Sequence, residues 1–268
     1  MPEMDIVENY YNDDPESEWN RLARHRTEMD ITLRALAEFL PPAPARLIDI
    51  GGGPGRYAIR LSQMGYSVTL LDLAEGNLKV ARAQAEAAGV QLEEVAQANA
   101  LDLSAYADDS FDAALLMGPL YHLLEAEERL NAVREAVRVV KPGGRVFASF
   151  INRHGVFRDA TVNGMAWVVS DLAYAWRMME TGRHDNGDGF TRAYFAHPAE
   201  IAPLMLAGGL QMVMMLACEG VVVDGMEEKV NQLGEADWKA WQDLNYAMAK
   251  DPTALGAACH ILHIGQKR

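Results

Sequence analysis

The chain has 268 residues, half of them hydrophobic, which is enough for one large α/β domain or two small ones with a sizeable buried core. The 38 acidic and 24 basic residues give a net charge of −14, and such a field repels nucleic acids and anionic membrane surfaces. The acidic N-terminus has no apolar leader, no window reaches the length of a membrane span, and the two cysteines lack metal-ligand spacing. We therefore expect a cytoplasmic protein with reduced cysteines and no metal site.

The first elements predicted in chain order are a helix and a strand. Met29, Leu33, Leu36 and Leu40 recur at helical spacing, and the prolines of residues 41–44 end that helix. The apolar run "RLIDI", residues 46–50, is the first predicted strand, and the glycine-rich stretch "GGGPG" follows it directly.

Strands and helices then alternate along the chain. Further strands are expected at residues 66–73, within 90–103, and at 110–118 and 145–151, with helices at 77–88 and on the stripe that runs from Leu130 to Val140. Gly89 is expected to end the first of these helices, and the turn "KPGG" the second. This alternation is typical of a parallel sheet with helices on both faces.

The pattern breaks at residue 152. Residues 152–197 show no clean strand but carry many aromatic side chains on helix-like sequence, with a turn-rich segment at 181–190, so we expect a helical lid insertion. Strands resume at 209–220 and 260–267, and the polar helical stretch between them, residues 226–250, is expected to cover the sheet.

The glycine stretch predicts a ligand site, because Gly51, Gly53 and Gly55 follow a strand and precede a helix. A carboxylate two residues earlier, Asp49, would repel the pyrophosphate of a dinucleotide but suits an ammonium or sulfonium group. Asp72 closes the second strand, where a carboxylate accepts hydrogen bonds from ribose hydroxyls. The ligand indicated is a nucleoside with a cationic tail, and S-adenosylmethionine fits.

From about Arg46 onward the sequence resembles the class I S-adenosylmethionine-dependent methyltransferases. The landmarks are "LIDIGGGPG", "LLDL", and "ANALDL" followed by "DDSFDAALLMGPLYHLL". The resemblance implies a Rossmann-like, seven-stranded, mostly parallel sheet whose last strand is antiparallel. We expect one domain, with an N-terminal helical flap (1–44), a cofactor-binding core (45–151), the lid insertion (152–197) and the C-terminal part of the sheet (198–268).

The resemblance also implies roles for individual residues. The glycine loop lies on the methionine part of the cofactor, Asp72 holds the ribose, and Leu73 packs on adenine. Asn99 stands where the family commonly has an aspartate facing the adenine amino group, and Met117 is expected beside the methionine chain. The full predicted cofactor set is Asp49, Gly51, Gly53, Gly55, Asp72, Leu73, Asn99, Ala100, Met117 and, from the flap, Arg24.

The acceptor side of the site is predicted from the flap, the loop after the fourth strand and the insertion. His122 is the candidate base for an amine or hydroxyl acceptor, or else a structural tie for its loop, and Tyr11 is expected to reach the site from the flap. The predicted acceptor-binding residues are Tyr121, Trp167, Tyr194 and His197. A small-molecule acceptor with methylation at N or O is expected; a nucleic-acid or protein methyltransferase and a non-catalytic cofactor-binding regulator are the alternatives.

Overall fold

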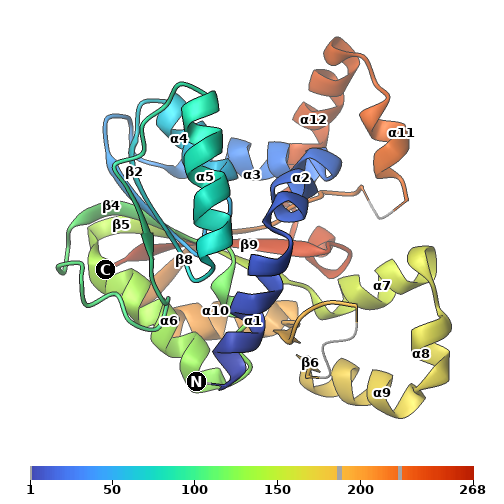
Figure 1. Ribbon diagram of the computed structural model, residues 1–268. Helices are drawn as coiled ribbons and strands as arrows, with labels where there is room; N and C mark the ends of the chain where they lie inside the picture. The colour runs from blue at the N-terminus through green and yellow to red at the C-terminus, as the bar shows by residue number, and fades with distance from the viewer. Residues whose placement is uncertain (1, 186–188, 223–224) are drawn as a thin grey trace.

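A seven-stranded sheet forms the centre of the computed structural model, which describes residues 2–185, 189–222 and 225–268 (Figure 1). The strand order is β3-β2-β1-β4-β5-β9-β8. Neighbouring strands from β3 to β5 pair in parallel, whereas β9 runs antiparallel between β5 and β8. The predicted sheet with an antiparallel last strand is therefore confirmed. The strands are β1 (Arg46–Ile50), β2 (Ser67–Asp72), β3 (Glu94–Gln97), β4 (Phe111–Leu116), β5 (Val140–Ile151), β8 (Leu210–Ala217) and β9 (His260–Lys267).

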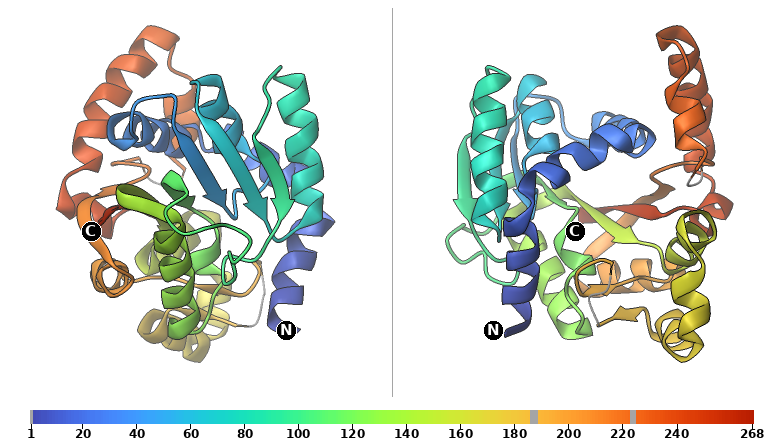
Figure 2. Two further views of the ribbon diagram at one scale, coloured as in Figure 1. Left: turned by 90° about the vertical axis from the view of Figure 1, so that its left-hand side faces the viewer. Right: turned by 45° about the vertical axis from the view of Figure 1, so that its right-hand side comes forward.

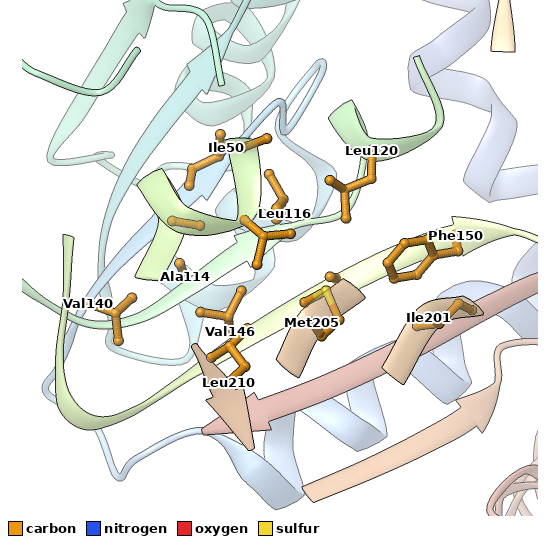
Figure 3. Close-up of a cluster of buried hydrophobic side chains, with 14 of the residues drawn as sticks. Ile50, Ala114, Leu116, Leu120, Val140, Val146, Phe150, Ile201, Met205 and Leu210 are labelled. Carbon is orange, nitrogen blue, oxygen red and sulfur yellow. The ribbon is translucent and has the colours of Figure 1, made fainter. Parts of the chain in front are cut away.

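Helices cover both faces of the sheet because successive strand side chains point to opposite sides. Leu47 of β1 belongs to a buried cluster with α3 (Arg26–Phe39), α4 (Arg56–Gln63) and α5 (Glu75–Ala87). Ile48 and Ile50 face the other way, into the cluster of α6 (Ala126–Val139) and α10 (Pro198–Ala207). Figure 3 shows part of this second cluster, in which Ile201 and Met205 of α10 lie against β5.

One predicted boundary was wrong at the junction of α6 and β5. The apolar stripe predicts helix as far as Val140, but the helix ends at Val139 and Val140 already pairs with Phe111 of β4. The "KPGG" segment lies inside β5, where the register to β4 shifts between Phe111 and Ala113. A β-branched residue satisfies both patterns, so periodicity alone did not separate them.

Two N-terminal helices, α1 (Pro2–Asp13) and α2 (Pro15–Arg24), lie across the end of the sheet beside α5 (Figures 1 and 2). Asn12 Oδ1 accepts a hydrogen bond from the Gly76 amide at 2.7 Å, and the Trp19 carbonyl accepts one from Arg56 Nε at 2.6 Å. The third helix of the predicted flap, α3, instead packs on the sheet, so the flap proper comprises α1 and α2.

The insertion after β5 folds around a small core of its own. It comprises α7 (Arg153–Asn163), α8 (Ala166–Ser170), α9 (Leu172–Thr181), β6 (Arg183–His184) and β7 (Ala193–Tyr194). Met178, Ala193 and Phe195 form its buried cluster. The sequence predicts no strand here, yet β6 and β7 pair in antiparallel fashion. Residues 186–188 of the predicted turn-rich segment lie outside the described residues.

The polar stretch before β9 forms two helices, α11 (Glu227–Asn231) and α12 (Glu235–Ala249), followed by the 3-10 turn η2 (Pro252–Gly256). The expectation that it covers the sheet was wrong for most of its length. Helix α12 packs on α3, with the Arg26 guanidinium 3.7 Å above the Trp238 ring and Lys250 paired to Glu38. Among the described residues, no helix is both long and apolar enough to cross a membrane.

Candidate active site

A cavity of about 160 Å³ lies at the carboxyl ends of β1, β2 and β4. The strand order reverses between β1 and β4, which is where open α/β sheets form their ligand crevice. The cavity is lined by residues of the flap, the glycine loop, the ends of β2 and β3, and the loop after β4; those used below are Tyr11, Glu18, Arg21, Asp49, Gly51, Gly53, Asp72, Leu73, Asn77, Asn99, Ala100, Met117, Tyr121 and His122.

Two of the three predicted loop glycines line this cavity. Gly53 has φ +58°, a conformation that glycine adopts without strain, and its amide donates to Asp72 Oδ2 at 2.8 Å. A Cβ at Gly53 would come no nearer than 3.9 Å to another side chain, so the loop leaves open space on this side. At Gly51 a Cβ would lie 2.6 Å from Pro119, so only glycine permits this close approach of the two loops.

Gly55 does not line the cavity, and its prediction as a cofactor contact is not matched by its position. It caps the N-terminus of α4 with φ +81°, and a Cβ there would lie 3.1 Å from Leu70 and 3.2 Å from Ala81. The residue therefore lets α4 pack closely on β2 and α5. The spacing of the motif indicates that this position requires glycine. It does not indicate whether the group packed against that glycine is a ligand or another helix.

Asp49 is a buried carboxylate that faces the cavity without a partner. It is 1 % exposed, and its Oδ2 makes no hydrogen bond among the described residues. Burial and, to a lesser extent, the nearby charge of Asp72 together raise the pKa of Asp49 to about 7. A Cβ at Gly52 would lie 2.5 Å from that same oxygen, so the loop backbone presses against the carboxylate. A cationic ligand in the cavity would stabilise the ionised form of this carboxylate by its charge.

Asp72 is held rigidly at the end of β2. Its Oδ1 accepts hydrogen bonds from the Ala74 amide at 2.9 Å and from Asn77 Nδ2 at 3.2 Å, in addition to the Gly53 contact of Oδ2. Burial raises the pKa of Asp72, while these hydrogen bonds lower it. Leu73 follows Asp72 on the cavity wall.

The predicted adenine side of the cavity is formed by Asn99 and Ala100, which both line it. Asn99 Oδ1 already accepts a hydrogen bond from the Leu101 amide at 3.0 Å, so this side chain is fixed in a turn rather than free. An amide oxygen has a second lone pair, which remains available for a donor from the cavity.

Tyr11 and His122 meet across the cavity, although they are far apart in the sequence. The Tyr11 hydroxyl lies 2.8 Å from His122 Nε2, and His122 Nδ1 lies 3.4 Å from the Arg192 carbonyl oxygen. The carbonyl can only accept, which places the imidazole proton on Nδ1 and leaves Nε2 as the acceptor for Tyr11. Burial lowers the pKa of His122 to about 4, so this imidazole is neutral at pH 7.

Met117 and Tyr121 complete the wall next to this pair. Both line the cavity, and the Tyr121 hydroxyl donates to the Met117 carbonyl at 3.3 Å. The rings of Tyr121 and His122 are in edge contact, with centroids 4.7 Å apart. The structure therefore brings these three predicted residues together.

Besides Gly55, four predicted site residues do not line the cavity. Arg24 is exposed at the end of α2, and Trp167 is 37 % exposed on α8 against Phe157. Tyr194 instead lines a separate small cavity, where its hydroxyl contacts Glu200, and His197 caps α10. None of the described residues of the insertion lines the cavity, so the positions of Trp167, Tyr194 and His197 do not match their prediction as acceptor-binding residues.

The insertion nevertheless lies next to the Tyr11–His122 pair. The Phe190 ring lies 5.9 Å from that of Tyr10 and 5.7 Å from that of His122. From the flap, Val7, Glu8, Tyr11, Glu18 and Arg21 line the cavity.

Several cavity residues were not predicted from the sequence, above all Glu18, Arg21 and Asn77. Arg21 lies one helical turn before Arg24 on α2. The sequence alone does not show where this helix ends, so it does not tell which of the two arginines reaches the cavity. Two acidic residues, Glu18 and Glu28, lie at helical spacing from Arg21. This pattern was the signal that could have favoured Arg21.

The parallel sheet with its switch-point cavity, glycine loop and strand-end carboxylates defines an α/β protein that binds a nucleoside-containing ligand. Residues 48–148 match the family described as "Methyltransferase domain". A "Ubiquinone biosynthesis O-methyltransferase" from Xanthomonas axonopodis pv. citri (strain 306) is 32% identical over 182 residues, covering 68% of this chain and 69% of that protein. The chain belongs to the S-adenosylmethionine-dependent methyltransferases.

Solved structures share the fold at low sequence identity. A methyltransferase from Methanosarcina mazei has a TM-score of 0.60 at 19% identity, covering 87% of this chain and 96% of that one. The 1,6-didemethyltoxoflavin-N1-methyltransferase of Burkholderia thailandensis, solved with its acceptor and S-adenosylhomocysteine, has a TM-score of 0.58 at 17% identity, covering 98% and 87%.

The residues present fit the family's cofactor. The unpartnered Asp49 oxygen suits its positive charge, the open side of Gly53 leaves room beside the loop, and Asp72 is fixed where a ribose is bound in such folds.

Proposed function

We propose that this methyltransferase acts on a hydroxyl group of a small molecule, with Tyr11 and His122 handling the acceptor's proton. The observation that carries the proposal is the 2.8 Å contact between the Tyr11 hydroxyl and Nε2 of the neutral, half-buried His122 on the cavity wall. The O-methyltransferase names of the relatives favour oxygen over nitrogen as the methylated atom.

The bound cofactor would supply an activated methyl group, so the chain has to position the acceptor, exclude water and remove a proton. Asp49, Asp72 and the glycine loop would hold the cofactor, and Met117 and Tyr121 would border the acceptor. The flap, α1 and α2, shields the cavity from bulk water. Positioning of two reactants accounts for most of the rate in such displacements.

The proton would move along the Tyr11–His122 pair. The cofactor would donate its methyl group to the acceptor oxygen and leave as S-adenosylhomocysteine, which makes the acceptor's hydroxyl proton strongly acidic. That proton would pass to the Tyr11 oxygen, while the Tyr11 proton would pass to His122 Nε2. The proton thus ends on the imidazole. A base of low pKa is sufficient here, because the donor is far more acidic during the transfer than an ordinary hydroxyl.

A nucleic-acid acceptor is disfavoured by the net charge of −14 and by the position of the cavity beneath the flap helices. A non-catalytic cofactor-binding protein would not need a tyrosine and a neutral histidine in contact inside the cavity. Both alternatives lead to distinct outcomes in a test of turnover.

The proposal is tested with a set of phenols, alcohols and amines, by following formation of S-adenosylhomocysteine. We expect turnover of hydroxyl acceptors, and a decrease in kcat of about 10²–10⁴-fold for His122→Ala. Tyr11→Phe should lower kcat with little change in cofactor affinity. Turnover confined to RNA, DNA or protein, or near-normal kcat in His122→Ala, would contradict the proposal.

A further inference from the structure

Five charged side chains form a row that runs from the cavity wall to the edge of the sheet. They are Glu18 and Arg21 of α2, Glu28 of α3, His260 at the start of β9, and Glu219 after β8. We call them the charge row. Their signs alternate, and two of them, Glu28 and Glu219, are only 6 % exposed. The cofactor interactions described above account for none of them.

At the cavity end, Arg21 is clamped by two carboxylates. Its Nη1 and Nη2 donate to the two oxygens of Glu28 at 2.9 and 3.1 Å, and its Nε donates to Glu18 at 3.2 Å. This bidentate geometry fixes the plane of a guanidinium that would otherwise have many rotamers. A guanidinium has five N–H groups, so one on Nη1 and one on Nη2 remain. These two point to opposite sides of the guanidinium, and one of them can donate to a ligand in the cavity that Arg21 lines.

Behind Arg21, the row is anchored to backbone. Glu219 Oε2 accepts hydrogen bonds from the Cys259 and His260 amides at 3.0 and 3.1 Å, and its Oε1 lies 2.7 Å from His260 Nδ1. His260 Nδ1 is also 3.7 Å from Glu28 Oε2. Burial disfavours a charged His260, but Glu28 and Glu219 outweigh it and raise its pKa to about 9.

The arrangement explains how Glu28 remains ionised in a buried place. Burial alone would raise its pKa, yet the charges of Arg21 and His260 lower it to about 2. Glu28, Glu219 and His260 are also metal-ligand types whose atoms lie within 4.8 Å of one another. Since both Glu28 oxygens contact Arg21 and His260 Nδ1 contacts Glu219, these atoms form ion pairs and not a metal site.

We propose that Glu28, fixed by His260 and Glu219, is a positioning residue that holds Arg21 at the cavity wall, where one of its remaining N–H groups donates to the carboxylate at the methionine end of the cofactor. Arg21 touches the ligand; Glu28 acts only through Arg21. The inference uses the cofactor of the family and does not depend on the proposed hydroxyl acceptor.

The test measures the affinities of two cofactor analogues by calorimetry. No acceptor is present, so the outcome is independent of the proposed function. S-adenosylhomocysteine carries the carboxylate, whereas 5′-methylthioadenosine lacks it. Glu28→Gln should weaken S-adenosylhomocysteine binding about tenfold and change 5′-methylthioadenosine binding less than twofold. Asp30→Asn, which removes one of the two carboxylate partners of Arg34 on the same helix, is the matched control and should change neither affinity.

A double-mutant cycle shows whether Glu28 acts through Arg21. In an Arg21→Ala background, Glu28→Gln should have no further effect on S-adenosylhomocysteine affinity. Unchanged affinity in the single variant, equal weakening of both ligands, or a full Glu28 effect without Arg21 would each overturn the proposal. If Glu28→Gln does not fold, Glu28→Asp and His260→Gln are measured in the same way. The ratio of the affinities for the two ligands then tests the proposal.

Discussion

Asp49 is the residue whose protonation the cofactor is expected to control. Its pKa is raised to about 7 because the carboxylate is buried beside Asp72. In the free protein the neutral form is favoured below that pH, and a cationic ligand favours the ionised form. Binding of the cofactor should therefore release a proton from Asp49 at neutral and mildly acidic pH.

We expect the affinity for S-adenosylmethionine to rise between pH 5.5 and about 7 and then to level off, with a slope approaching about tenfold per unit well below the pKa. Calorimetry in buffers of different ionisation enthalpy measures both the affinity and the proton release. Asp49→Asn should bind more weakly and lose the slope. A flat affinity profile for the unaltered protein would contradict this role of Asp49.

Single residues also show what sequence reasoning could and could not reach. Asp49, Asp72 and the glycines were predictable because their roles depend on local backbone at a strand end. Arg21 was missed in favour of Arg24, since the cavity contact depends on how α2 lies on the core. Tyr194 was misplaced because its hydroxyl binds Glu200, a contact between two elements that no spacing indicates.

At the scale of elements, the strands were the most predictable feature. The apolar runs of β1 and β9 predicted the bounds of both strands correctly, and at β1 the glycine-rich stretch that begins at Gly51 ends the strand. The insertion was predicted to exist, but its aromatic residues do not reveal which side they face. Trp176 on α9 is 61 % exposed, and such a residue cannot be told from a cavity residue by type alone.

The insertion leads to a prediction that separates its aromatic residues by position. Trp167→Ala should leave cofactor affinity and the acceptor KM within about twofold, because Trp167 does not line the cavity. Phe190→Ala removes ring contacts to Tyr10 and His122 and should lower kcat/KM by about tenfold. Steady-state kinetics on both variants measures these effects. A larger effect of Trp167→Ala would show that the insertion binds the acceptor.

For the whole molecule, buried histidines shape the dependence of stability on pH. Burial lowers the pKa of His122 and of His263 to about 4. Below about pH 6.5 the unfolded chain therefore binds protons that the folded protein does not, and stability falls as the pH decreases. Asp49 acts in the opposite sense over the same range, but it is one group against two. His260, with its raised pKa, loses its stabilising charge between pH 6.5 and 9.

The free energy of unfolding should thus be greatest near pH 6.5 to 7, as measured by urea denaturation from pH 4.5 to 9. His263→Leu should reduce the acid slope and add about 1 kcal/mol, because both ring nitrogens of His263 are buried without partners among the described residues. His154→Leu, at an exposed position, is the control. An unaltered acid slope in His263→Leu would show that this histidine is not responsible.

The place of β9 in the sheet has a consequence for protein synthesis. β9 pairs with β5 on one side and β8 on the other, yet residues 152–259 leave the ribosome before β9 does. Until then, β5 and β8 each carry an open edge, and open edges invite pairing with other chains. We therefore expect the nascent protein to be most prone to such pairing until β9 has been translated and lies between β5 and β8, after which β8 is the outer strand at this end of the sheet.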